Sequence, residues 1–319
     1  MKADELAISI ASIVPVAFIL IIFGFLVFKA YPSMVYNGIK FFTSYVWNPG
    51  DISAEPIVVR GFKVSPGASF GILLFLTGTL ITSAVALLLS LPASIFASIA
   101  LALYLNERIR AVVSSALGLF AGIPSVIYGL WGVVFLEPTL YSRVEPEMRA
   151  LLGFIPFFSG PIYSGSGILA SSLVLALMVF PISTSIIYQS AVSLRDAAVN
   201  DALALGATKW EAGKLLRSMM RKQILGGGLL SLGRALGETM AVLMTCGGAI
   251  NSMPTNFYSP INTMAAALTA LLDSAFIDPT GMVLSSLAEL GVTLLLISVV
   301  SSMIGRAILG MVALRGELE

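Results

Sequence analysis

The chain has 319 residues, of which 57% are hydrophobic and only 11% charged, and its formal net charge is +1. A soluble chain carries about a quarter charged residues, so the composition excludes an ordinary soluble domain and indicates an integral membrane protein. The absence of histidine and the single cysteine, Cys246, exclude a histidine general base, a disulfide within the chain and a cysteine-rich metal site.

Six apolar stretches of about 20 residues predict six transmembrane helices in an all-α polytopic fold. The first stretch is longer than the apolar region of a signal peptide, roughly 7 to 15 residues, so we expect it to be retained. Pro92, Pro124 and Pro181 predict kinks in the second, third and fourth spans. The six predicted spans are 7–30, a part of 70–105, 111–136, 167–192, 224–250 and 282–309.

The distribution of basic residues predicts the orientation. Eleven of the 18 lysines and arginines lie at the N-terminus, in 106–110, in the loop 193–223 and after residue 305. Six lie in the intervening segments, and Arg234 lies within the fifth span. Because basic residues concentrate in cytoplasmic loops, we expect both termini in the cytoplasm. We find no internal repeat and no low-complexity linker, which predicts one transmembrane domain.

No motif for nucleotide hydrolysis or other catalysis is present. The segment GATKWEAGK, at 206–214, has six residues between its glycines and Leu215 after its lysine. A phosphate-binding loop needs four residues between the glycines and Ser or Thr after the lysine. We therefore expect no enzymatic activity, no metal site and no cofactor in this chain.

The long inner loop 193–223 alternates small and charged residues. Gly206 interrupts its helical pattern, which predicts two short helices with a bend between them. Such a segment can dock into a groove on a partner protein. The residues alone equally allow an amphipathic helix on anionic lipid, because Arg217, Arg221 and Lys222 follow it.

The fifth predicted span carries Arg234 and Glu238, four residues apart, which places them on one face of a continuous helix. A lone charge at the centre of a bilayer costs several kcal/mol, so the pair serves either structure or function. In the first interpretation it is a buried ion pair that locks helix packing. In the second, Arg234 binds a tetrahedral oxyanion and Glu238 positions the arginine. Small residues that permit close helix packing surround the pair, namely Gly226, Gly227, Gly228, Ser231, Gly233 and Gly237.

The inner loop resembles the EAA loop of permease subunits in binding-protein-dependent ABC importers, most closely in LALGATKWE at 203–211. Anchored on Gly206, this sequence has Asn200-Asp201-Ala202 where the family has Glu-Ala-Ala, and it lacks the family's Leu-Pro. The resemblance implies that the loop contacts an ATPase. The expected coupling residues are Ala197, Ala198, Asp201, Ala202, Leu205, Gly206, Ala207, Lys209, Trp210 and Glu211.

GRALGETMAV, at 233–242, resembles the signature of the PstC-type permease subunit of phosphate ABC importers, in the MetI-like transmembrane domain family. GTLITS at 78–83, GIPSVIYGLWG at 122–132 and FPISTS at 180–185 support the same family. Sulfate and molybdate permeases share the Arg-Ala-x-Gly-Glu core but continue differently. The companion PstA-type subunit usually continues with Thr-Ala-Pro.

The resemblance implies a type I ABC importer domain over 70–319, preceded by the first helix and an outer segment in 1–69. It implies alternating-access import of inorganic phosphate across the cytoplasmic (inner) membrane, with Arg234, Glu238 and Thr239 along the substrate path. The implied partners are a PstA-type permease subunit, two ATPase subunits that bind ATP and Mg²⁺, and a phosphate-binding protein outside. The alternatives are a permease for sulfate or molybdate, the companion phosphate subunit, or an anion transporter or channel without an ATPase.

Overall fold

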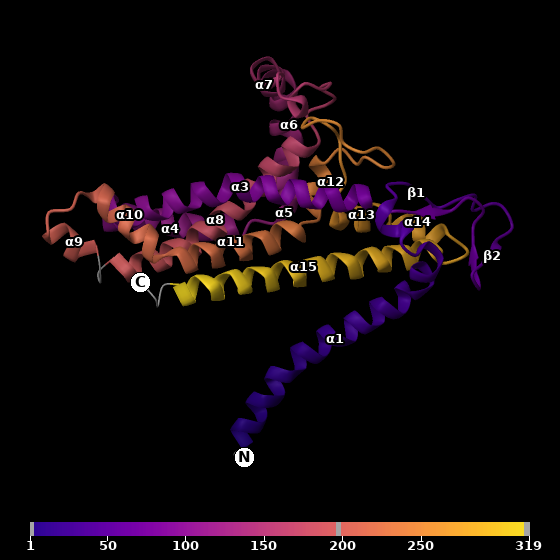
Figure 1. Cartoon of the computed structure of the whole chain (residues 1–319), viewed down its shortest axis with the longest axis horizontal. Helices are drawn as coiled ribbons and strands as arrows, with labels where there is room; N and C mark the ends of the chain where they lie inside the picture. The colour runs from indigo at the N-terminus through magenta and orange to yellow at the C-terminus, as the bar shows by residue number, and fades with distance from the viewer. Residues whose placement is uncertain (1–2, 196–198, 316–319) are drawn as a thin grey trace.

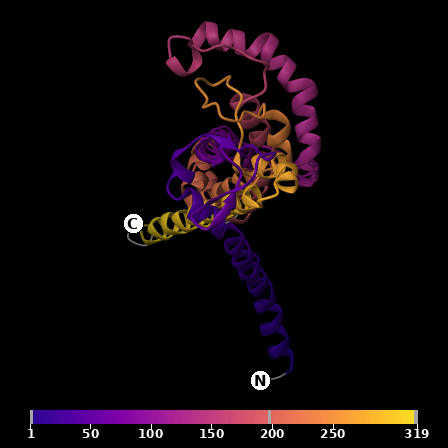
Figure 2. The same ribbon diagram turned by 90° about the vertical axis from the view of Figure 1, so that its right-hand side faces the viewer.

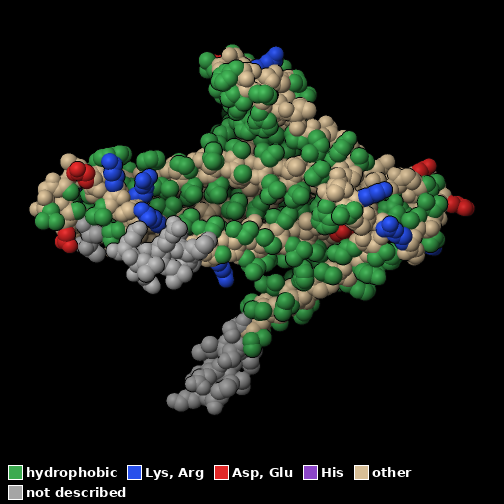
Figure 3. All heavy atoms as spheres, viewed as in Figure 1, with side chains coloured by type: hydrophobic (Ala, Val, Ile, Leu, Met, Phe, Trp, Pro, Cys, Tyr) green, Lys and Arg blue, Asp and Glu red, His purple; other side chains and the backbone are tan. Residues whose placement is uncertain are grey.

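The computed structural model describes residues 3–195 and 199–315, with side chains described over 13–195 and 199–308. Apart from the first helix, its long helices run side by side along one axis, with residues 199–219 at one end and the short strands at the other (Figure 1). Within the described residues, four helices are long and apolar enough to cross a membrane, or five if one bent helix pair is a single span. Hydrophobic side chains cover much of the flank in Figure 3, and charged ones gather chiefly at the ends. This is the arrangement of a multi-pass membrane protein.

The four candidate spans lie within α1 (Ala3–Asn37), α3 (Leu73–Leu103), α8 (Ile168–Leu194) and α15 (Met282–Arg315). Four short strands form two antiparallel pairs, β1 with β4 and β2 with β3. The strands are β1 (Trp47–Asn48), β2 (Ile57–Val59), β3 (Phe62–Val64) and β4 (Ser69–Phe70). The remaining elements are α2 (Lys40–Thr43), α4 (Glu107–Ala121), α5 (Ser125–Trp131), η1 (Gly132–Leu136), α6 (Glu137–Thr139), η2 (Leu140–Val144), α7 (Glu145–Leu152), η3 (Pro156–Phe158), α9 (Asn200–Ala204), α10 (Lys209–Met219), α11 (Arg221–Leu236), α12 (Met240–Thr245), α13 (Met264–Ala270) and α14 (Leu272–Ile277).

Helices α3 and α8 form the centre of the bundle and are joined by serine hydroxyls. The Oγ atoms of Ser94 and Ser183 lie 2.9 Å apart, and Ser98 Oγ donates to the carbonyl of Thr184 at 2.9 Å. Small side chains allow two apolar helices to approach closely enough for such bonds. Pro92 is accommodated inside α3, which continues from Leu73 to Leu103 without division.

The third predicted span, 111–136, is not one straight helix. Helix α4 ends at Ala121, and the helical segment Ser125–Leu152 departs from it at 92°. We call Ser125–Leu152 the arm, and Figure 2 shows it curving away from the bundle. Pro124 explains the break, because proline offers no amide donor and disfavours a helical conformation in the residue before it.

The fifth predicted span, 224–250, is also interrupted. Helix α11 ends at Leu236 and α12 begins at Met240. Gly237, Glu238 and Thr239 form the break. The expectation that Arg234 and Glu238 lie on one continuous helix is therefore wrong.

A buried polar cluster attaches α1 to α15. Ser33 Oγ donates to Glu289 Oε2 at 2.5 Å and lies 3.0 Å from Ser286 Oγ. Asn37 Nδ2 donates to Ser33 Oγ at 2.8 Å. All four side chains are buried, so Glu289 is a packing residue between two helices and not a residue at the lipid–water interface.

Replacing Glu289 with leucine is expected to detach α1. The buried hydroxyl of Ser33 would lose its carboxylate acceptor, which costs about 1–3 kcal/mol. Glu289→Gln is the matched control, because its amide oxygen still accepts from Ser33. The thermal unfolding midpoint of the purified protein should fall for the leucine variant and stay near the parent value for the glutamine variant. Equal midpoints for all three proteins would contradict this role of Glu289.

Candidate functional site

The segment between α8 and α11 has the predicted form of two short helices with a bend. Helix α9 and helix α10 are separated by Gly206, whose φ is +91°. Residues with a β-carbon rarely adopt this left-handed conformation, and glycine adopts it freely. No described atom lies within 4 Å of the position where a Gly206 β-carbon would be built, so the backbone conformation and not a lack of space favours glycine here.

Helix α10 is held by one buried face and presents the other to solvent. Ala212, Leu216 and Met220 are fully buried and pack against Ile99 and Leu103 of α3. At the tip of the segment, Leu205 is 90% exposed and Trp210 is 61% exposed. Large apolar side chains exposed at a polar end of the molecule mark a surface for a partner.

The remaining expected coupling residues lie near these two side chains. Within the described residues, none of them is buried: Asp201, Gly206, Lys209 and Glu211 are exposed, and Ala202 and Ala207 are half-buried. Ala197 and Ala198 lie outside the described residues. Lys209 Nζ lies 5.6 Å from the ring centre of Tyr104, which extends the contact between α10 and the end of α3.

A capping box fixes the start of α10. The Thr208 amide donates to Glu211 Oε2 at 2.8 Å, and the Glu211 amide donates to Thr208 Oγ1 at 3.3 Å. These reciprocal bonds satisfy two amide groups that the first helical turn leaves free. The hydrogen bond from the Thr208 amide, more than any other contact, holds the pKa of the Glu211 carboxyl below its usual 4.5.

The capping box is expected to lose order in acid. Because the folded-state pKa of Glu211 is lowered, its stabilising contribution is complete above pH 4.5 and disappears as the pH falls through the folded-state pKa. Hydrogen exchange at the amides of 208–212, corrected for intrinsic rates, should accelerate in that range. In the Glu211→Gln variant, the corrected exchange rate of the same amides should not depend on pH. A pH-dependent acceleration that persists in this variant would contradict the assignment to Glu211.

The interrupted fifth span places Arg234 and Glu238 in different surroundings. Arg234, in the last turn of α11, is exposed, whereas Glu238 is 9% exposed. Glu238 Oε1 accepts from the Ala241 amide of α12 at 3.4 Å, and half-buried Thr239 donates to the Gly237 carbonyl at 3.3 Å. Within the described residues no ion pair joins Arg234 to Glu238, so the buried-pair interpretation has no support in this chain.

Helix α11 has one packed face and one open face. On the packed face, β-carbons added at Gly227 and Gly228 would lie 3.4 Å from Ile187 and 3.2 Å from Leu91. Ser231 and Ala235 continue this face and are buried. The open face around Arg234 is formed by three glycines and one exposed leucine: Gly226, Gly233, Gly237 and Leu230. No described atom lies within 4 Å of a β-carbon added at Gly226 or Gly233, so the guanidinium stands on an uncovered surface.

The first turns of the arm pack against α12, the helix that follows Glu238 and Thr239. Added β-carbons at Gly129 and Gly132 would lie 2.8 Å from Met244 Sδ and 2.6 Å from Thr245 Cγ2, so these glycines let α5 and η1 contact α12. Tyr128 donates to the Phe120 carbonyl at 2.9 Å across the bend. Both glycines of this contact, and Tyr128, belong to the motif GIPSVIYGLWG.

The chain is similar to proteins of bacteria and of an archaeon that are described as phosphate transport system permeases. A phosphate transport system permease protein PstC 1 of Mycobacterium tuberculosis is 35% identical over 93% of this chain and 89% of its own length. A PstC of Mesorhizobium japonicum is 35% identical over 85% of this chain and 78% of its length. A probable PstC of Methanocaldococcus jannaschii is 30% identical over 95% and 92%. No model of a protein family matches the chain.

Proposed function

This chain belongs to the PstC family of phosphate transport system permease proteins, and from that membership we propose how its residues carry phosphate across the membrane. As a member, it is a permease subunit of a phosphate ABC transport system, and ATP is hydrolysed on a separate subunit. The single observation that carries the proposal is the exposed Arg234 on the open face of α11.

Arg234 is suited to phosphate by its chemistry and position. A guanidinium offers paired donors that match two oxygens of a tetrahedral oxyanion, and its charge persists at every physiological pH. A charge near the middle of a membrane is tolerated where it faces an aqueous path or a partner. We infer that the open face of α11 lines the path, with the second permease subunit across from it.

Glu238 and Thr239 lie in the break between α11 and α12, directly after the helical turn that carries Arg234. The Glu238 carboxylate accepts from the first turn of α12, so it fixes the direction of α12 relative to α11. Because the backbone leaves the helical path at Gly237, a small rotation there can turn Arg234 toward either side of the membrane. Glu238 is thus a positioning residue, and Thr239 lies beside the path.

The remaining architecture follows the type I importer arrangement. We infer six spans in the cytoplasmic membrane, with α4 plus the arm as the third and α11 plus α12 as the fifth. The end of the bundle that carries α9 and α10 is cytoplasmic, as are both termini (Figure 1). The strands at the opposite end then face the phosphate-binding protein.

ATP hydrolysis is coupled to phosphate transport through the short, buried junction between α10 and α11. Two ATPase subunits, which hold ATP and Mg²⁺, act on the exposed tip around Leu205 and Trp210. Only Met220 separates α10 from α11, and that side chain is fully buried. A displacement of α10 is therefore transmitted directly to the helix that carries Arg234. We expect no metal or cofactor bound by this chain itself.

The deciding experiment measures uptake by the reconstituted complex, with a PstA-type permease, the ATPase and the binding protein, in the presence of ATP. Phosphate and its close analogue arsenate should enter, and sulfate and molybdate should not. ATP-dependent uptake of sulfate or molybdate in preference to phosphate would contradict the proposal. Uptake that proceeds without the ATPase would contradict it as well.

A further inference from the structure

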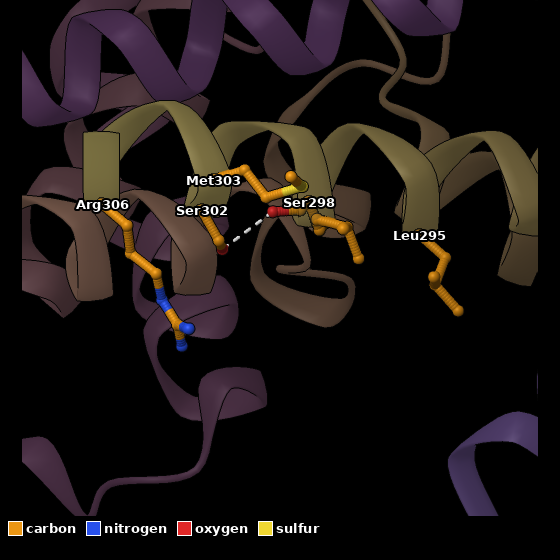
Figure 4. Close-up of a pocket in the computed structure, with 6 residues that line it drawn as sticks. Leu295, Ser298, Ser302, Met303 and Arg306 are labelled. Atoms are coloured by element: carbon orange, nitrogen blue, oxygen red, sulfur yellow. Dashed lines mark hydrogen bonds between the residues drawn. The ribbon is translucent and has the colours of Figure 1, made fainter. Parts of the chain in front are cut away.

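A groove of about 380 Å³ lies along the half of α15 that is remote from the strands. Two rows of side chains, one helical turn apart within each row, line it. One row is apolar, and the other carries two hydroxyls followed by a guanidinium (Figure 4). The apolar row is Leu295, Val299 and Met303, and the polar row is Ser298, Ser302 and Arg306.

No described helix covers this groove. Helix α1 contacts α15 nearer the strands, where Ala30 packs with Ala288 and Val292. Beyond that contact α1 diverges from α15 (Figure 1), and the space-filling view shows an open wedge between the two helices (Figure 3). The opposite side of α15 is occupied, because a β-carbon on Gly305 would overlap the Leu229 side chain of α11. The groove therefore opens into the wedge and toward the surrounding membrane.

The dimensions of the groove match one leaflet. Leu295 and Arg306 are eleven residues apart, which corresponds to about 16 Å along a helix. Half of a hydrocarbon core is about 15 Å thick. With the α9–α10 end in the cytoplasm, as proposed above, Arg306 lies at the depth of the inner-leaflet headgroups and Leu295 lies near the bilayer centre.

No described carboxylate pairs with the guanidinium of the polar row. Ser302 donates to the Ser298 carbonyl at 2.9 Å, and Ser298 donates to the Leu294 carbonyl at 3.0 Å, so both hydroxyl donors are already used. Arg306 is exposed and, within the described residues, makes no ion pair or hydrogen bond. A guanidinium at the headgroup level attracts a lipid phosphate, and the apolar row offers a surface to an acyl chain.

We propose that this groove is a binding site for one anionic phospholipid of the inner leaflet. Its phosphate binds Arg306, and one acyl chain lies along Leu295, Val299 and Met303. The lipid fills the wedge between α1 and α15 and supports α1 where protein contacts end. A helix of the second permease subunit is the competing occupant.

Native mass spectrometry of the purified intact complex tests this site. The probes are phosphatidylglycerol and phosphatidylcholine with identical acyl chains. The parent complex should retain phosphatidylglycerol in preference, and Arg306→Gln should weaken its retention about fivefold. Val299→Trp, which fills the groove, should weaken retention of both lipids. Arg108→Gln, an exposed arginine on α4, is the matched control and should bind like the parent.

Two results would overturn the proposal. One is an equal preference for phosphatidylglycerol in the parent and in Arg306→Gln. The other is efficient cross-linking of Ser302→Cys to the second permease subunit, with no lipid retained at the groove. Because lipid retention is measured without substrate or ATP, failure here is distinguishable from failure of the proposed phosphate path.

Discussion

Arg234→Ala is expected to abolish phosphate uptake while the complex still assembles. The side chain is exposed on α11 and makes no ion pair with Glu238, so its removal leaves no buried partner unsatisfied. The path would lose a paired, charge-assisted donor set, worth about 3 kcal/mol or roughly a hundredfold. Arg234→Lys keeps the charge without the paired geometry and should restore only part of the uptake.

The measurement is ATP-dependent phosphate uptake into proteoliposomes, with complex assembly followed by size-exclusion chromatography. Arg221→Ala is the matched control, because Arg221 is an exposed arginine at the start of the same helix. Unchanged uptake in Arg234→Ala would remove the residue from the path. Loss of assembly would assign it a structural role at the interface with the second permease subunit.

Leu205→Asp is expected to separate this subunit from its ATPase. Leu205 is 90% exposed at the bend between α9 and α10, so a charged replacement does not disturb the fold of this chain. It would instead place an unpaired carboxylate in the apolar centre of the interface, where burial of a charge is costly. Trp210→Ala removes the second large side chain of the same surface and should act in the same direction.

Co-purification of the ATPase subunit and ATP-dependent uptake are the two readouts. Both should fall at least tenfold for Leu205→Asp, since truncation or charging of a central interface side chain costs about 2 kcal/mol or more. Val58→Asp is the control for co-purification of the ATPase alone, because Val58 is 69% exposed in the strand pair at the opposite end of the molecule. ATPase retention that matches the parent in Leu205→Asp would show that another surface makes the contact.

The sequence by itself determined that this is a membrane protein and located most of its spans. A mean hydropathy of +0.96 and apolar runs of bilayer length require a lipid environment, whatever the tertiary packing. The two short helices with a bend at Gly206 were also predictable, because Gly206 and the Thr208–Glu211 capping box act through the local backbone. Family membership was visible in short motifs such as GRALGETMAV, since the chemistry of a site restricts its residues locally.

Only the tertiary structure decided where the third and fifth spans break and what surrounds their charges. Hydropathy records how apolar a segment is and not the direction in which it runs, so 224–250 and 111–136 each read as one helix. The fifth helix is interrupted between Arg234 and Glu238, where α12 packs against the arm through Gly129 and Gly132. Glu289, likewise, is buried because α1 brings Ser33 to it from more than 250 residues away in the chain. Such contacts depend on which helices meet, and no local pattern of residues records that.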